Sequence, residues 1–408
     1  MWRSRVAIVR VLAGLALLAA VPRAQRLVES VPDPYTGGEP AAMAAAGYVS
    51  FGPFPFGLRR SSADVESLLG DEPLVWIETA HFRIGCALSP LRLRGDRDWV
   101  DRTQAELTQL KERLPRVKPA TRELDPWLRA HLIALRCEAL YAEVRDNLGA
   151  TDATFQQAPA HAGRGDPRAF EGFGPHLGME HKFSVLLLQR AANLARYTRA
   201  WHGGETQAPS RHHDTGAGLD FAVAEETADG LLRDDFALHS YLVYNLAANL
   251  YNGYRGCYHE LPPWLLGGLA HWHARHVSPR FPFFERPVGG ENPVGYDCWQ
   301  WDERARGLLR TGAFEPIAQL MERPDLKAFD LEQHIESWAL VDYLMSTRRV
   351  AAMKFLRDVK DPFHQLRRAP TREEVHERAR ERFEPAFGMT PEAMDAAWRA
   401  QVGGRRRK

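Results

Sequence analysis

Two nearly uncharged helical segments constrain the fold of this chain more than any other feature. The first is LHSYLVYNLAANL at residues 238–250, and the second is LPPWLLGGLAHWHARH at residues 261–276. Glycines at 267 and 268 would let the second helix approach a neighbouring helix closely, at some cost to helix propensity. We therefore expect these segments to form a closely packed helix pair.

The rest of the chain divides into a part with strands and a part without them. The segments LVWIETAHFRI, KFSVLLLQ and GLDFAVAEET are rich in β-type residues and predict strands, whereas residues 98–114 and 126–148 have helical patterns. Residues 299–402 show short amphipathic helical patterns alone. The sequence thus predicts an α+β fold, in which a small mixed sheet with helices precedes an all-helical part. The expected divisions are a signal peptide at 1–24, a Pro-, Gly- and Ala-rich linker at 25–72, an α/β part at 73–229, the helix pair and its following loop at 230–298, a helical part at 299–402 and a basic tail at 403–408.

The N-terminus has the features of an export signal. A positive flank, MWRSRVAIVR, precedes the apolar run VLAGLALLAAV, which is shorter than the roughly 20 residues that a transmembrane helix needs. We expect an exported protein, periplasmic or extracellular. An uncleaved anchor stays open because Pro22 fits the small-residue cleavage rule poorly.

Four cysteines fit an oxidising compartment, where disulfides persist. Three full pairings are open, and Cys257 with Cys298 is the favoured pair because both lie in loop-like stretches beside one predicted helix.

The charge balance argues against two classes of partner. A formal net charge of +1 gives no reason to expect nucleic acid or an anionic membrane. We expect no membrane contact beyond the signal segment, and we leave the oligomeric state open.

The frame LPPWLLGGLAHW resembles a pattern found in one class of zinc peptidases, the gluzincins. In several exported bacterial branches of that class, the helix that carries the third zinc ligand begins Leu-Pro-x-Trp-Leu-x-Glu-Gly-Leu-Ala. WIETAHFRI is similar to the first strand of those proteins, and ESWALVDYLMSTRRVAAMKFLRDV and AFGMTPEAMDAAWRAQV are similar to their C-terminal helices. The resemblance, to peptidase-MA-like families of uncharacterised function, covers roughly residues 73–402. It implies a HExxH helix with two zinc-binding histidines, a general-base Glu between them and a ligand Glu on the next helix.

The departures from this pattern fall on the chemistry. If His239 takes the place of the first histidine, Ser240 replaces the general-base Glu and Val243 replaces the second histidine. The third-ligand Glu becomes Gly267. Serine cannot accept a proton as a carboxylate does, and neither Val nor Gly binds a metal. We therefore expect no bound metal, no cofactor and no catalytic residue at these positions, and a hydrogen-bonded core histidine at 239.

A rearranged metal site is the alternative. His271 lies one helical turn after Gly267 and could join His239 and a carboxylate such as Glu260 or Asp214, since zinc accepts these ligands. Other candidate ligands are His212, His213, His273 and His276. The simpler interpretation makes RHHD, at residues 211–214, a solvated polar loop.

Three functions follow from these patterns. The first is an exported, non-catalytic scaffold that binds a peptide or an envelope protein in the old substrate cleft, with Tyr244, Trp264 and His271 as candidate lining. GLDFAVAEET or KFSVLLLQ would supply a strand edge for the peptide. The second is an active hydrolase with rearranged ligands. The third is a structural role in the cell envelope, favoured if aromatic side chains fill the cleft.

Overall fold

A five-stranded mixed sheet forms the centre of the strand-containing half. The computed structural model describes residues 32–70, 72–151, 154–155, 172, 174–214, 217–257, 259–281, 300–361, 363, 366 and 368–404. Within these residues the sheet has the spatial order β1-β2-β5-β7-β6, with β2, β5 and β7 parallel and the outer strands β1 and β6 antiparallel to their neighbours. This arrangement confirms the predicted α+β class with a small mixed sheet. The strands are β1 (Val75–Glu78), β2 (Phe82–Cys86), β5 (Phe183–Leu188), β7 (Gly218–Ala224) and β6 (Ser210–Asp214), and β3 (Leu91–Arg92) pairs with β4 (Glu123–Leu124) in a separate two-stranded sheet.

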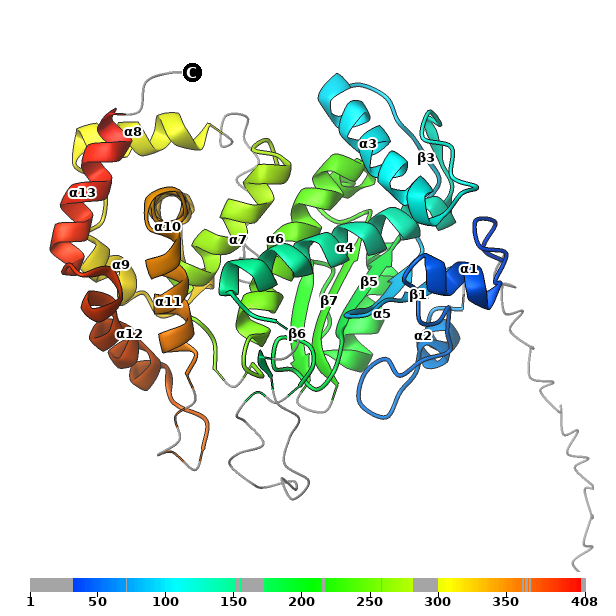
Figure 1. Cartoon of the computed structure of the whole chain (residues 1–408), viewed down its shortest axis with the longest axis horizontal. Helices are drawn as coiled ribbons and strands as arrows, with labels where there is room; N and C mark the ends of the chain where they lie inside the picture. The colour runs from blue at the N-terminus through cyan, green and yellow to red at the C-terminus, as the bar shows by residue number, and fades with distance from the viewer. Residues whose placement is uncertain are drawn as a thin grey trace, which may run out of the picture.

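Helices cover both faces of the sheet because alternate side chains of each strand point to opposite faces. Ile84, Val185 and Phe221 belong to a large core beneath α4 (Pro126–Leu148) and α6 (Asp235–Gly253). Leu186 and Ala222 belong to a smaller core on the other face. That second core is covered by α5 (Ala191–Trp201) and α2 (Ser62–Leu68). α3 (Arg97–Arg113) lies on α4, outside the sheet (Figure 1).

Helix α4 begins at Pro126 and ends just before Gly149, the residue types that commonly stand at the two ends of a helix. The side chain of Asp125 accepts from the N–H of Leu128 at the first turn, and Gly149 ends the helix with φ of 60°. A left-handed residue at this position suits glycine, which has no Cβ to clash.

Three sequence expectations need correction. LVWIETAHFRI forms the hairpin β1–β2 rather than one strand, because Thr79 closes a turn through Phe82 without a Gly or Pro signal. RHHD is part of strand β6 and not a loop. The described part of the expected linker is folded: it contains α1 (Pro40–Ala45) and α2, and Phe54 and Phe56 are buried in the smaller core.

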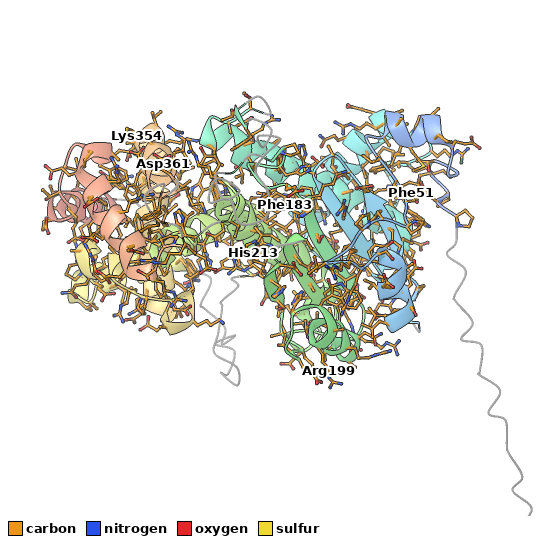
Figure 2. All side chains as sticks on the ribbon, turned by 90° about the horizontal axis from the view of Figure 1, so that it is seen from below. Phe51, Phe183, Arg199, His213, Lys354 and Asp361 are labelled. Carbon is orange, nitrogen blue, oxygen red and sulfur yellow. The ribbon has the colours of Figure 1, made fainter. Side chains whose placement is uncertain are left out.

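The second half of the chain is helical, as expected. α7 (Pro263–Val277) packs between α6 and α10 (Leu331–Thr347), so it lies at the centre of the helical half. The helices α8–α13 lie on the side of the molecule away from α1 and α2 (Figure 1), and His213 of β6 lies between the sheet and the helical half (Figure 2). The remaining elements are η3 (Leu231–Arg233), α8 (Trp301–Thr311), α9 (Ile317–Met321), η4 (Leu326–Ala328), α11 (Arg349–Val359), α12 (Arg372–Phe387) and α13 (Pro391–Gly404).

Several expectations lie partly or wholly outside the described residues. These are the signal segment, most of the loop at 278–297, and Cys298. Cys86, Cys137 and Cys257 are free thiols. Across the residues that the structure describes, no helix is long and apolar enough to span a membrane.

Candidate functional site

His239, the aligned first zinc ligand, is buried in the first turns of α6 beside a pair of charged residues. Its exposed fraction is 8 %. Asp235, one turn earlier on α6, forms an ion pair of 2.8 Å with Arg136 of α4. Burial, and then the positive charge of Arg136, lower the pKa of His239 well below its usual value. The imidazole is therefore neutral at pH 7, and Arg136 already places a positive charge near it.

The charges around His239 form a buried network that needs no added ion. Arg129 of α4 holds Glu225 at 2.5 Å and lies 3.8 Å from Asp235. Arg136 holds Glu106 at 2.7 Å in addition to Asp235. Burial by itself would raise the pKa of Asp235, but Arg136 and then Arg129 hold it at about 2. The negative charge next to His239 is thus already paired with guanidinium groups, which would repel a metal cation.

Ser240 and Val243 contribute to the packing of α6. The hydroxyl of Ser240 donates to the carbonyl of Phe281 at 3.1 Å, and the carbonyl of Ala274 lies 3.4 Å away. Val243 is 5 % exposed in the main core. Ser240 therefore links α6 to the end of α7 in place of the expected general base.

The two glycines of α7 leave no space where the third zinc ligand would project. A Cβ added to Gly267 would lie 2.6 Å from a methyl carbon of Leu326 in η4. A Cβ added to Gly268 would lie 2.4 Å from a methyl carbon of Val341 and 2.5 Å from the carbonyl oxygen of Ser337, both on α10. An apolar side chain thus occupies the position that a carboxylate would need, and α10 lies directly against the next residue.

His271 belongs to a buried aromatic cluster of its own. Its Nε2 lies 3.1 Å from Nδ1 of His334, and its ring lies 4.7 Å from the rings of both Tyr244 and Trp301. Burial, and then His334, lower the pKa of His271 well below the usual range. Trp264 lies elsewhere, stacked at 6.1 Å on Phe355. Tyr244 and Trp264 are fully buried and His271 is 1 % exposed, so the expected cleft lining is core.

The histidines and carboxylates proposed for a rearranged metal site do not converge. His273 contacts Tyr251 at 3.0 Å, and His276 contacts the carbonyl of Trp272 at 2.6 Å. Among the described residues no group of three or more His, Cys, Asp or Glu side chains is placed to hold a metal ion.

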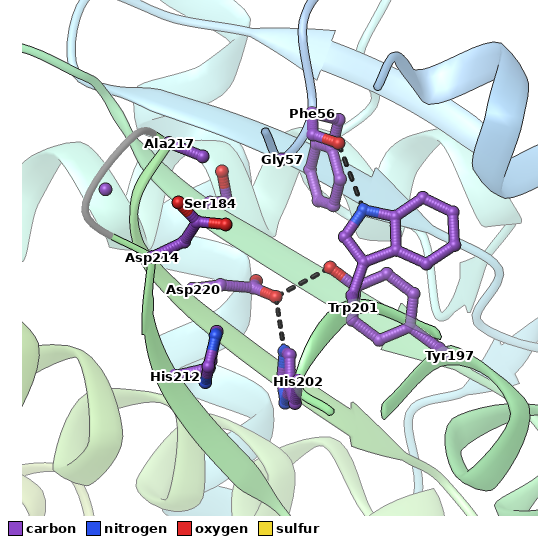
Figure 3. Close-up of a pocket in the computed structure, with 11 residues that line it drawn as sticks. Phe56, Gly57, Ser184, Tyr197, Trp201, His202, His212, Asp214, Ala217 and Asp220 are labelled. Atoms are coloured by element: carbon purple, nitrogen blue, oxygen red, sulfur yellow. Dashed lines mark hydrogen bonds and ion pairs between the residues drawn. The ribbon is translucent and has the colours of Figure 1, made fainter. Parts of the chain in front are cut away.

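A polar cluster that the sequence patterns did not reveal lies on the α5 face of the sheet (Figure 3). Oδ2 of Asp220 in β7 accepts a hydrogen bond of 2.6 Å from the hydroxyl of Tyr197. The same oxygen lies 2.7 Å from Nε2 of His202. Nδ1 of His202 lies 2.8 Å from the hydroxyl of Ser210, and the rings of His202 and His212 stack at 4.8 Å. A small pocket of about 20 Å³ adjoins the cluster. Its lining includes Phe56, Ser184, Trp201, His202, His212, Asp214, Ala217 and Asp220.

The one sequence signal for this cluster was RHHD, which strand β6 presents on two faces. Register pairs His212 with Asp220 and Asp214 with Gly218, toward the α5 face. Arg211 and His213 alternate with them, pair with Phe221 and Leu219, and therefore face the helical half. His202 and Asp220 lie in segments without a recognisable motif, so only the fold brings them to this strand.

β6 is the outer strand of the described sheet on the side of the helical half. β5 and β7, the strands formed by KFSVLLLQ and GLDFAVAEET, are paired on both sides and cannot supply an edge. Glu260, before α7, is close enough to act electrostatically on both Arg211 and His213. Glu260 also lines a pocket of about 150 Å³ formed with Pro262, Pro324 and His376.

Comparison with known proteins identified no relative of this chain. The chain matches no protein-family model, no curated protein and no solved structure.

Proposed function

We propose that this chain is an exported, non-catalytic protein of gluzincin-like design that binds an extended polypeptide along the outer edge of β6. The observation that carries the proposal is the position of β6. It is the outer antiparallel strand of the described sheet, and Leu326 lies where the resemblance would place the third zinc ligand. The gluzincin likeness itself rests on the sequence resemblance.

The packing of α6 and α7 supports the non-catalytic part of this proposal. Val243 carries no group that can bind a metal, and Ser240 has no carboxylate to act as a general base. Leu326 lies against Gly267, and guanidinium groups pair with the carboxylate beside His239. A zinc hydrolase built on the gluzincin pattern would need a metal ligand and a base at these positions.

Binding along a strand edge requires none of those groups. Main-chain hydrogen bonds of an added strand give affinity, and pockets for alternate side chains give specificity. β6 has recognition groups on both faces: His212 and Asp214 toward α5, and Arg211 and His213 toward Glu260. The pocket of about 150 Å³ beside Glu260 offers space for a side chain of benzene size.

The test is selection of binders from a random decapeptide display library against the mature protein, followed by N-methylation of the best peptide at each position in turn. Strand addition predicts loss of binding at alternate positions, since only every second N–H of an added strand points toward β6. A library that yields no binder, or a peptide that tolerates every N-methyl group, would refute the proposal.

A structural role is the second candidate because aromatic side chains fill the space around His271. Tyr244, Trp301 and His334 surround this imidazole. The same library separates the two candidates, since a purely structural protein selects no peptide that competes at β6.

A further inference from the structure

We propose that the small pocket between α5, β6 and β7, here called the Asp220 pocket, binds a primary ammonium group. In a peptide held on β6 this group is a lysine side chain, and that second statement rests on the proposed function. The Asp220 pocket (Figure 3) lies on the opposite face of the sheet from α6, so it is separate from His239, Ser240 and Val243 on that helix.

One oxygen of Asp220 is the first reason. Oδ2 is held by Tyr197 and His202, whereas Oδ1 is buried and receives no hydrogen bond from the described residues. A buried carboxylate oxygen without a donor is costly, and a ligand with N–H donors would remove that cost. Asp214 adds a second carboxylate to the wall of the pocket.

The charge of the pocket favours a cation over a neutral donor. Among the described residues of its lining, Asp214 and Asp220 are acidic and none is Lys or Arg. Burial, and then His202, lower the pKa of His212, so this imidazole adds no positive charge at pH 7. The rings of Phe56, Tyr197, Trp201 and His202 and four small residues form the rest of the lining.

The size of the pocket selects the kind of cation. A cavity of about 20 Å³ holds about one water-sized group. An ammonium head has that size and three N–H donors, whereas a guanidinium group or a trimethylated ammonium is larger. The pocket therefore distinguishes a lysine from an arginine.

The register of β6 connects this pocket with a bound peptide. His212 and Asp214 lie on the same face of β6 and opposite Asp220 and Gly218. A strand added outside β6 would lie about 4.8 Å from β6, and so two strand spacings from Asp220 on β7, with alternate side chains on that face. An extended lysine side chain that crosses β6, together with a hydrogen bond from its ammonium tip, can reach the pocket wall formed by Asp214 and Asp220.

The first experiment tests the pocket without any peptide. The mature protein with ¹³C-labelled histidine is titrated with n-butylammonium while the ring signals of His202 and His212 are followed by NMR. We expect a saturable shift, with at least about tenfold weaker binding in Asp220→Asn, since this loses a charge-assisted hydrogen bond.

Two controls make that experiment decisive. Butyltrimethylammonium is too large and should give no saturable shift, and Ala217→Leu should fill the pocket and abolish binding even if Asp220→Asn perturbs the fold. A linear response to n-butylammonium, or equal binding by the trimethylated compound, would overturn the ammonium assignment.

The second experiment uses a peptide selected on β6 and its lysine-to-norleucine analogues. We expect one lysine whose replacement weakens binding about tenfold to the native chain but not to Asp220→Asn. Equal affinities for lysine and norleucine would overturn the lysine assignment while leaving binding at β6 intact. Failure to select any peptide would refute the proposed function, and the butylammonium titration would still decide the pocket.

Discussion

Gly267 and Gly268 offer a controlled test of the packing of α7 against η4 and α10. The two residues are neighbours in the middle of α7, so replacement of either by alanine gains the same helix propensity, about 1 kcal/mol. They differ in what the added methyl group meets. At position 267 it meets the end of a leucine side chain, and at position 268 it meets the backbone carbonyl of Ser337.

The distances set the expected magnitudes. Real Cβ atoms essentially never lie closer than 3.0 Å to another heavy atom, so the 2.5 Å contact in Gly268→Ala requires α7 and α10 to separate by about 0.5 Å. Strain of this kind typically costs about 1–3 kcal/mol and exceeds the gain in propensity. In Gly267→Ala the methyl group of Leu326 can rotate away, so we expect a stability within about 1 kcal/mol of the native chain.

The assay is urea denaturation followed by tryptophan fluorescence, with both variants measured in the same buffer. Gly268→Ala should unfold at a lower urea concentration than Gly267→Ala. If Gly268→Ala is as stable as the native chain, α10 does not lie against α7 as described. The variant Gly268→Ser serves as a control. Its side chain is larger than that of alanine, so this variant should be still less stable than Gly268→Ala.

Three further predictions concern charge and metal. After dialysis against trace zinc, the chain purified without a His-tag should retain no zinc by mass spectrometry, and a ratio near one that falls in His239→Ala would contradict the proposed function. Arg136→Met should cost about 3–5 kcal/mol in urea at pH 7, because it leaves Asp235 buried without its main partner. The pKa of Asp235 in the folded chain, about 2, is below its ordinary value of 3.8. The ion pair of Asp235 with Arg136 therefore stabilises the fold above pH 3.8, and this stabilisation is lost as the pH falls through 2. If Arg136→Met loses as much stability at pH 2 as at pH 7, this pairing is refuted. Burial raises the pKa of Glu336, which is 2 % exposed, to about 8 from 4.5. Its protonated form therefore favours the folded state fully below pH 4.5, and this stabilisation is lost as the pH rises through 8. Glu336→Gln should reduce the fall in urea stability between pH 5 and pH 9, and an unchanged fall would exclude Glu336 as its cause.

Elements with local signals were predictable from the sequence. The helix expected at 126–148 is α4, because a capping Asp and a terminal Gly specify its ends over a few residues. KFSVLLLQ is β5, because a short run of apolar residues suits a strand buried on both faces. The hairpin β1–β2 escaped notice because its turn depends on a threonine hydroxyl rather than on Gly or Pro.

The candidate sites depended on contacts that no local pattern encodes. The resemblance to the gluzincin pattern predicts no metal ligand at Val243 and Gly267, but the packing of Leu326 against Gly267 comes from a segment about 60 residues further along the chain. His202 and Asp220 meet only because α5 and β7 pack together. The polar character of RHHD favours a loop, but antiparallel pairing with β7 makes these residues part of strand β6.

The buried ion network also determines whether the chain can be divided. Arg129 and Arg136 belong to α4 in the first half, and they bind Glu225 just after the last strand as well as Asp235 at the start of the helical half. A fragment that ends near residue 229 would keep both guanidinium groups in an apolar interior with one carboxylate removed. A fragment that begins there would leave Asp235 without both of its guanidinium partners from α4. The boundary between strands and helices is therefore a change of architecture within one cooperative unit, and neither half is suited to transfer into another protein on its own.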